Sequence, residues 1–183
     1  MEQFRKSPRV GFLDYDNGDY FITICTKNKV HYFGDIYNGE MHLSALGKFV
    51  ETQLGMASTF NKNIDVPVFT VMPNHIHAIV CIKCRDMPLA CSSGDAQQRS
   101  PNPSLRANPT YQRYVPALSR YISSLKGAVS KFAKSNGHDF DWQPRFHDHY
   151  IRGSHDGNRI AEYIINNVAR WQEDCFNQDE IQI

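Results

Sequence analysis

The sequence lacks an excess of charge of either sign. Its 183 residues include 20 Lys and Arg against 19 Asp and Glu, which leaves a formal net charge of +1. This balance excludes a globally basic nucleic-acid coat and an acidic disordered tail, although it allows a local basic face. Long apolar runs are also missing, since Tyr20–Cys25 and Ala78–Ile82 are far too short to span a membrane. No apolar segment follows the charged N-terminus, so we expect a cytoplasmic protein with no signal peptide and no membrane partner.

The chain has few cysteines, and they form no disulfide framework. Their number is odd, at five, which favours reduced thiols. Cys81 and Cys84 form a single CxxC pair, and a closed zinc site would need two more ligands at a suitable spacing. Cys81 also continues the alternating pattern of a strand, so we expect a small core residue rather than a zinc ligand.

The length suits a single domain over residues 1–183. β-branched and aromatic runs predict strands at 20–26, 66–72, 75–82 and about 146–151. Helical periodicity predicts helices at 44–60, at 117–134 and from an N-cap at Asp156 through Val168. The stretch at about 83–116 is rich in Pro, Ser and Asn and predicts a mobile loop. This order favours an α+β, ferredoxin-like (RRM-like) antiparallel sheet with helices on one face and an added C-terminal helix.

Two histidines near the middle of the chain form the sharpest local pattern. His75 and His77 lie two residues apart on a predicted strand, so both imidazoles should point to the same face. Ile76 then points to the opposite, helix-covered face. Two neutral imidazoles side by side make half of a divalent-metal site. Two ligands rarely define a metal site alone, so an isolated pair is more often two partly exposed sheet histidines that bind nothing.

A second pattern lies on the last predicted helix. Tyr163 and Asn167 are four residues apart, so a phenol and an amide oxygen share one helix face. This arrangement could place a nucleophile beside a metal ligand. The alternative is that Tyr163 packs against the sheet and Asn167 only marks the polar end of the helix.

Taken together, these patterns resemble a known family. The pair His75–Ile76–His77 after Met-Pro-Asn resembles the HUH motif, and YIxxN at Tyr163–Asn167 resembles the nucleophile helix of single-tyrosine HUH transposases. The stretch from Trp142 to Arg152 is similar to a signature of the REP-associated tyrosine transposases, and YFITICT near the N-terminus matches their opening strand. These proteins are related to the transposases of the smallest bacterial insertion sequences.

The resemblance implies a role for each matched residue. His75, His77 and Asn167 would bind a divalent metal, Mg²⁺ or Mn²⁺, and Tyr163 would be the nucleophile. Attack by its phenol would leave a covalent 5′-phosphotyrosine and a free 3′-hydroxyl, which stores the phosphodiester energy for rejoining. The expected partner is single-stranded or hairpin DNA, bound by a monomer or a homodimer. One departure is Val168, where members of the family often have proline.

Other residues fit this chemistry less sharply. The further tyrosines Tyr111, Tyr114, Tyr121 and Tyr150 have no asparagine four residues on, and the pair His147 and His149 could make structural hydrogen bonds or contact DNA. We predict DNA contacts from Arg113, Arg120, Lys126, Lys131 and Arg152. Such residues could equally form an ordinary solvated surface.

The sequence thus predicts a metal-dependent, single-strand DNA endonuclease and strand transferase that cuts near hairpins. Two alternatives stay open at this point. One is a catalytically silent protein that only binds DNA hairpins, and the other is a metal-dependent hydrolase that uses water as its nucleophile.

Overall fold

The computed structural model describes residues 17–83 and 116–177. The loop predicted at about 83–116 therefore falls almost wholly outside the described residues, as do Arg113, Tyr111 and Tyr114. The strands are β1 (Gly18–Cys25), β2 (Gly34–Tyr37), β3 (Glu40–Leu43), β4 (Ile64–Val71), β5 (His75–Ile82) and β6 (His147–Tyr150). The α-helices are α1 (Ala45–Gly55), α2 (Ala57–Phe60), α3 (Ala117–Ser135) and α4 (Gly153–Asn166), with short 3₁₀ turns at Lys27–Lys29 and Trp171–Glu173.

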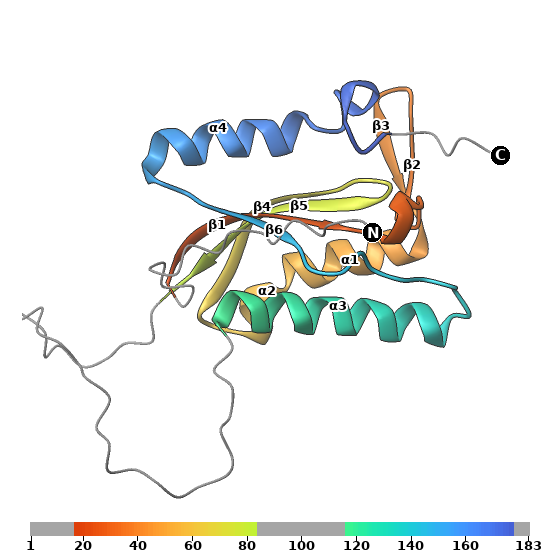
Figure 1. The fold of residues 1–183 in the computed structure, drawn as a ribbon, viewed down its shortest axis with the longest axis horizontal. Coiled ribbons are helices and arrows are strands. Elements are labelled where there is room, and N and C mark those ends of the chain that lie inside the picture. The colour runs from red at the N-terminus through yellow and green to blue at the C-terminus, as the bar shows by residue number, and fades with distance from the viewer. Residues whose placement is uncertain (1–16, 84–115, 178–183) are drawn as a thin grey trace, which may run out of the picture.

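Four strands form one antiparallel sheet in the order β4-β5-β1-β6 (Figure 1). With α1 between β1 and β4, and α3 between β5 and β6, this is the β-α-β-β-α-β arrangement of ferredoxin-like folds. Strands β2 and β3 pair separately as a hairpin. Asn38 and Gly39 at its turn have φ of 54° and 77°, as a type I′ turn requires. The predicted α+β class is confirmed.

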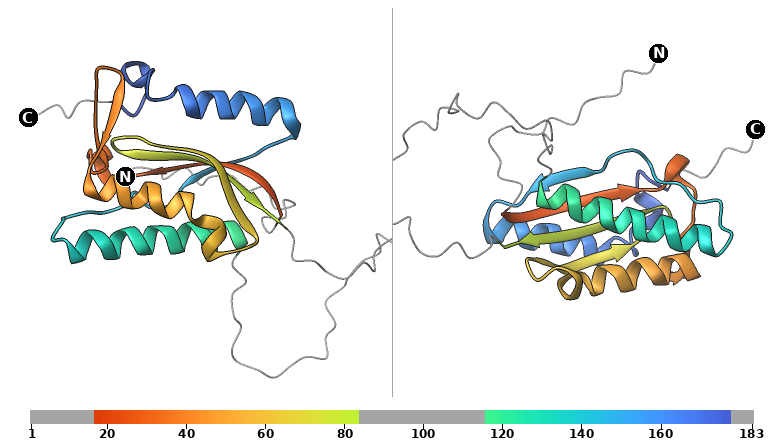
Figure 2. Two further views of the ribbon diagram at one scale, coloured as in Figure 1. Left: turned by 180° about the vertical axis from the view of Figure 1, so that it is seen from behind. Right: turned by 90° about the horizontal axis from the view of Figure 1, so that it is seen from below.

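The two faces of the sheet carry different helices. Helices α1 and α3 cover one face, and α4 runs across the other (Figures 1 and 2). Alternate residues such as Ile22, Ile24 and Ile76 pack into the large core beneath α1 and α3. A smaller cluster of Ile79, Ile151, Ile160 and Ile164 holds α4. The side chains of β1 and β5 that point away from the large core therefore face α4.

Two predicted helix boundaries differ from the structure. The helix expected at 44–60 divides at Met56, whose φ of −98° and ψ of 12° interrupt the helix after Gly55. The last helix begins at Gly153 rather than after Asp156. The reason is that the Asp156 carboxylate accepts the Arg152 backbone N–H at 3.2 Å from inside the first turn. Of the helices in residues 17–83 and 116–177, none is both long and apolar enough to cross a bilayer.

Candidate functional site

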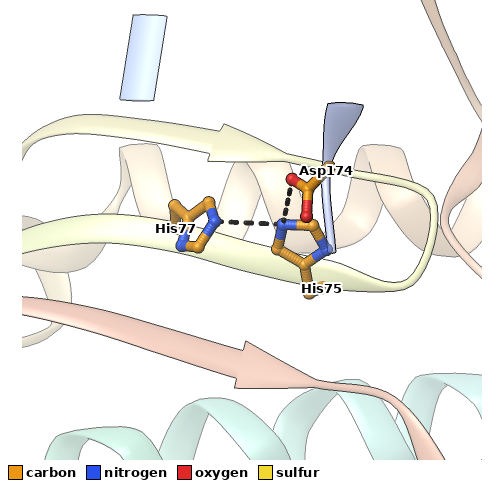
Figure 3. Close-up of side chains that lie close together, drawn as sticks. All are labelled: His75, His77 and Asp174. Atoms are coloured by element: carbon orange, nitrogen blue, oxygen red, sulfur yellow. Dashed lines mark hydrogen bonds and ion pairs between the residues drawn. The ribbon is translucent and has the colours of Figure 1, made fainter. Parts of the chain in front are cut away.

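The two histidines of β5 meet on the face of the sheet that α4 covers. Their Nε2 atoms lie 3.1 Å apart, and their side chains are 0% and 2% exposed (Figure 3). Ile76 between them packs into the large core on the opposite face. The alternation of the strand thus places both imidazoles together, as the spacing of His75 and His77 predicts.

A buried amide fixes the orientation of the first imidazole. Asn74 donates from Nδ2 to the carbonyls of Lys29 at 3.0 Å and Phe176 at 2.9 Å, so its Oδ1 is left to accept. That oxygen lies 2.9 Å from Nδ1 of His75. Nδ1 therefore carries the proton, and the lone pair of His75 is on Nε2, facing His77.

The second imidazole is held by strand β1. The Thr23 hydroxyl lies 2.9 Å from Nδ1 of His77, and the Phe21 ring stacks on the imidazole at 5.3 Å between centroids. Partners of this kind on the far ring nitrogen set the tautomer and orientation of metal-binding histidines. Nε2 of His77 is again the atom that faces the cluster.

A carboxylate that the sequence did not indicate joins the pair. Asp174 follows the 3₁₀ turn after α4, and its Oδ2 lies 3.8 Å from Nε2 of His75 (Figure 3). Its side chain is 5% exposed, and the Phe176 ring covers His75 at 4.5 Å between centroids. No periodic pattern links Asp174 to the histidines, which lie about a hundred residues earlier in the chain. The only sequence signal was its position just beyond the nucleophile-like helix.

The helix α4 brings the predicted nucleophile to the same place. The Tyr163 hydroxyl lies 3.3 Å from Nε2 of His77, and the two rings meet edge to face at 5.3 Å between centroids. Asn167, one turn later, is 3% exposed. Tyr163 itself is 42% exposed, so its ring borders both the cluster and solvent.

Burial dominates the electrostatics of these groups. Desolvation lowers the pKa of His75, and the neighbouring His77 acts in the same direction. Desolvation also lowers the pKa of His77 to about 4, although a hydrogen bond with the Ile22 backbone acts in the opposite direction. Burial raises the pKa of Tyr163, as does the nearby charge of Asp174, whereas the Asn167 side chain lowers it. Both imidazoles are therefore neutral near pH 7, which is the form that binds metals.

The cluster fits a divalent cation. One ligand atom from each of His75, His77 and Asp174 lies within 4.8 Å of the others. The 3.1 Å between the Nε2 atoms is close to the ~3 Å that separates adjacent ligand atoms around an ion bound at about 2.1 Å. Two buried oxygens on the chain after Tyr163, Asn167 Oδ1 and Asp174 Oδ2, have no hydrogen-bond partner among the residues that the structure describes. Buried acceptors of this kind call for a bound ion or water.

Most of the predicted DNA contacts lie on the other side of the sheet. Arg120, Lys126 and Lys131 belong to α3, which covers the face opposite to α4 (Figure 1). Lys126 also donates from Nζ to the carbonyls of Gln143 at 2.8 Å and Arg145 at 2.6 Å. Arg152, by contrast, precedes α4 directly. Because Arg120, Lys126 and Lys131 lie on α3, they could reach DNA bound at the histidine cluster only if the strand extends around the molecule. Their role in DNA binding stays a prediction.

Comparison with known proteins assigns the chain to a family. No protein-family model matches it. Its sequence is 32% identical to an uncharacterized protein of Haemophilus influenzae over 183 residues, covering 96% of this chain and 94% of that protein. This chain belongs to the same family as the Haemophilus influenzae protein.

The structure of a REP-associated tyrosine transposase bound to a REP hairpin is also similar. It superimposes with a TM-score of 0.53 at 16% identity, covering 94% of this chain and 74% of that one. Similarity at this identity establishes the fold. This chain thus shares the fold of that transposase, the fold that the resemblance in the motifs implies.

Proposed function

We propose that this protein is a metal-dependent endonuclease and strand transferase acting on single-stranded DNA next to hairpins, through a covalent tyrosine intermediate. The observation that carries the proposal is the 3.3 Å approach of the Tyr163 hydroxyl to Nε2 of His77, within a buried cluster able to bind a cation. The hairpin-bound structure with the same fold supports DNA as the substrate. We further propose that the whole chain, 1–183, forms one domain acting in the cytoplasm.

Four side chains would hold the metal: His75 and His77 through Nε2, Asp174 through a carboxylate oxygen, and Asn167 through its amide oxygen. When bound, the ion would polarise a non-bridging phosphate oxygen and stabilise the charge that develops during phosphoryl transfer. Mg²⁺ prefers oxygen ligands, while two imidazoles and a carboxylate suit Mn²⁺ better. We therefore expect Mn²⁺ to support activity at least as well as Mg²⁺.

The residues of this chain supply the nucleophile and its placement. The Tyr163 oxygen would form a bond to phosphorus while the bond from phosphorus to the 3′-oxygen breaks. The phenolic proton would pass to solvent, and a proton from solvent would complete the released 3′-hydroxyl. The Tyr163 ring packs against the rings of His77 and Phe21, with 5.3 and 6.1 Å between centroids. These contacts would hold the phenol in place for this attack.

The test compares Tyr163→Phe with the wild type in a cleavage assay. A labelled hairpin strand with Mn²⁺ should be cut by the wild type, whereas Tyr163→Phe should lose at least about 10³-fold in rate, since only the attacking oxygen is removed. Tyr37→Phe, at an exposed tyrosine of the β2–β3 hairpin, should cut normally. Cleavage by Tyr163→Phe at the wild-type rate would instead show a water nucleophile. If the wild type binds the hairpin but does not cut it, the protein is instead the catalytically silent hairpin-binding protein.

A further inference from the structure

A pocket of about 540 Å³ adjoins the site on the outer side of Tyr163. Its walls come from β1, β6, α4 and the turn after α4, and they include Phe21, Arg159, Tyr163, Asn166 and Arg170. Pockets of this size hold small organic molecules. Tyr163 lines this pocket, and its hydroxyl lies 3.3 Å from Nε2 of His77. A DNA strand with its phosphate at the Tyr163 hydroxyl would therefore lie beside the pocket.

The lining of the pocket suits a nucleotide. Phe21 is a partly buried ring, supported from behind by the His77 imidazole, which is a suitable platform for a base. Arg159 and Arg170 bring two guanidinium groups, which recognise phosphates with forked hydrogen bonds.

The polar groups between these walls suit the edge of a base. Asn166 donates from Nδ2 to the Glu162 carbonyl at 2.9 Å. Its Oδ1, which has no hydrogen bond within residues 17–83 and 116–177, could accept from a base. Glu162 is the acidic member of the lining, and its carboxylate can accept from an exocyclic amino group. Paired bases hide these edges, so the pocket would select an unpaired nucleotide.

We propose that this pocket binds one unpaired nucleotide of the DNA strand, adjacent to the phosphate that Tyr163 attacks, with its base on Phe21 and the phosphates that flank it along the strand against Arg159 and Arg170. The identity of the ligand rests on the proposed function. Arg159 is paired with Asp156 at 2.9 Å, which restricts its guanidinium near the start of α4. Phe21, Arg159 and Arg170 would thus be determinants of strand recognition.

The experiment measures binding in EDTA, where nothing is cut. Two fluorescein-labelled hairpins share one stem; the first is blunt and the second has five unpaired thymidines at each end. By fluorescence anisotropy, the wild type should bind the extended hairpin about tenfold more tightly, in line with stacking of one base. Arg170→Gln and Phe21→Leu should each reduce this gain to about twofold or less. Lys48→Gln, which removes one positive charge from the exposed surface of α1, should keep it.

Crosslinking locates the nucleotide directly. With 5-iododeoxyuridine in the extension, irradiation should attach the strand to the peptide that contains Phe21 or Tyr163. Equal affinity of the wild type for both hairpins, an undiminished gain in both variants, or crosslinks confined to α3 would each overturn the proposal. If the wild type shows the gain but never cuts DNA with Mn²⁺, the pocket assignment stands and the proposed enzymatic function falls.

Discussion

At the scale of single residues, the site depends on how each imidazole is held. His75 is oriented by Asn74 and His77 by Thr23, so both free lone pairs meet at the same point. Two unprotonated nitrogens 3.1 Å apart repel each other unless a proton or a cation lies between them. The carboxylate of Asp174 brings the negative charge that favours a cation there.

The first prediction concerns this carboxylate. Asp174→Asn should weaken Mn²⁺ binding by about 10–100-fold in titration calorimetry, because an amide oxygen replaces a charged ligand. Glu173→Gln, at the exposed neighbouring position, removes the same charge and should leave the affinity unchanged. Equal Mn²⁺ affinity in Asp174→Asn and the wild type would remove Asp174 from the ligand set.

These residues also show what the sequence can predict at a site. The pairing of His75 and His77 follows from the period of a strand, and Tyr163 with Asn167 follows from the turn of a helix. Asp174 could not be predicted in this way. Its approach to His75 depends on the path of the chain after α4, which is fixed by contacts such as that of Asn74 with the Phe176 carbonyl.

At the scale of elements, α4 decides whether the site forms. It packs on the sheet through Ile160 and Ile164 against Ile79 and Ile151. This cluster is small compared with the core beneath α1 and α3, so we expect α4 to be displaced more easily than those two helices. The position of Tyr163 over His77 therefore depends on a few isoleucines.

Two adjacent isoleucines of α4 provide a matched test. Ile164 is fully buried, whereas Ile165 is 68% exposed. Ile164→Ala should lower the free energy of unfolding by about 2–5 kcal/mol in urea titrations and slow cleavage, because it loosens α4. Ile165→Ala should change the free energy of unfolding by less than about 0.5 kcal/mol. Equal effects of the two substitutions would mean that α4 does not pack on the sheet as described.

The elements themselves were largely predictable, and their ends were not. The strands β1, β4 and β5 and the helix α3 follow from strong alternation or helical periodicity. The start of α4 was misplaced because Asp156 has the chemistry of an N-cap but acts from within the first turn. The break at Met56 arises from backbone angles that its own side chain does not signal.

At the scale of the whole molecule, the sheet separates two tasks. One face carries the large core, and the other carries the buried imidazoles of His75 and His77. Buried neutral histidines make the free energy of unfolding depend on pH. His77 has a pKa of about 4 in the folded protein, and an unfolded histidine has a pKa near 6.5. Below about pH 6.5 the unfolded chain therefore binds more protons than the folded one.

The metal-free protein should accordingly lose stability as the pH falls from about 6.5 towards 4. Each of the two buried histidines contributes at most about 1.4 kcal/mol per pH unit in this window. Urea titrations at several pH values in EDTA would measure the slope. His77→Gln should flatten it, whereas His147→Gln, at an exposed position of β6, should preserve it. A slope that stays unchanged in His77→Gln would contradict burial of this imidazole in the neutral form.

The most direct test of the central claim is mass spectrometry of the protein after reaction with a hairpin strand and Mn²⁺. The account predicts a covalent protein–DNA adduct that survives denaturation, with the DNA attached to the peptide of α4 that contains Tyr163. The same reaction with Tyr163→Phe should give no adduct. Cleavage of the strand without any adduct, or an adduct on a different tyrosine, would contradict the account.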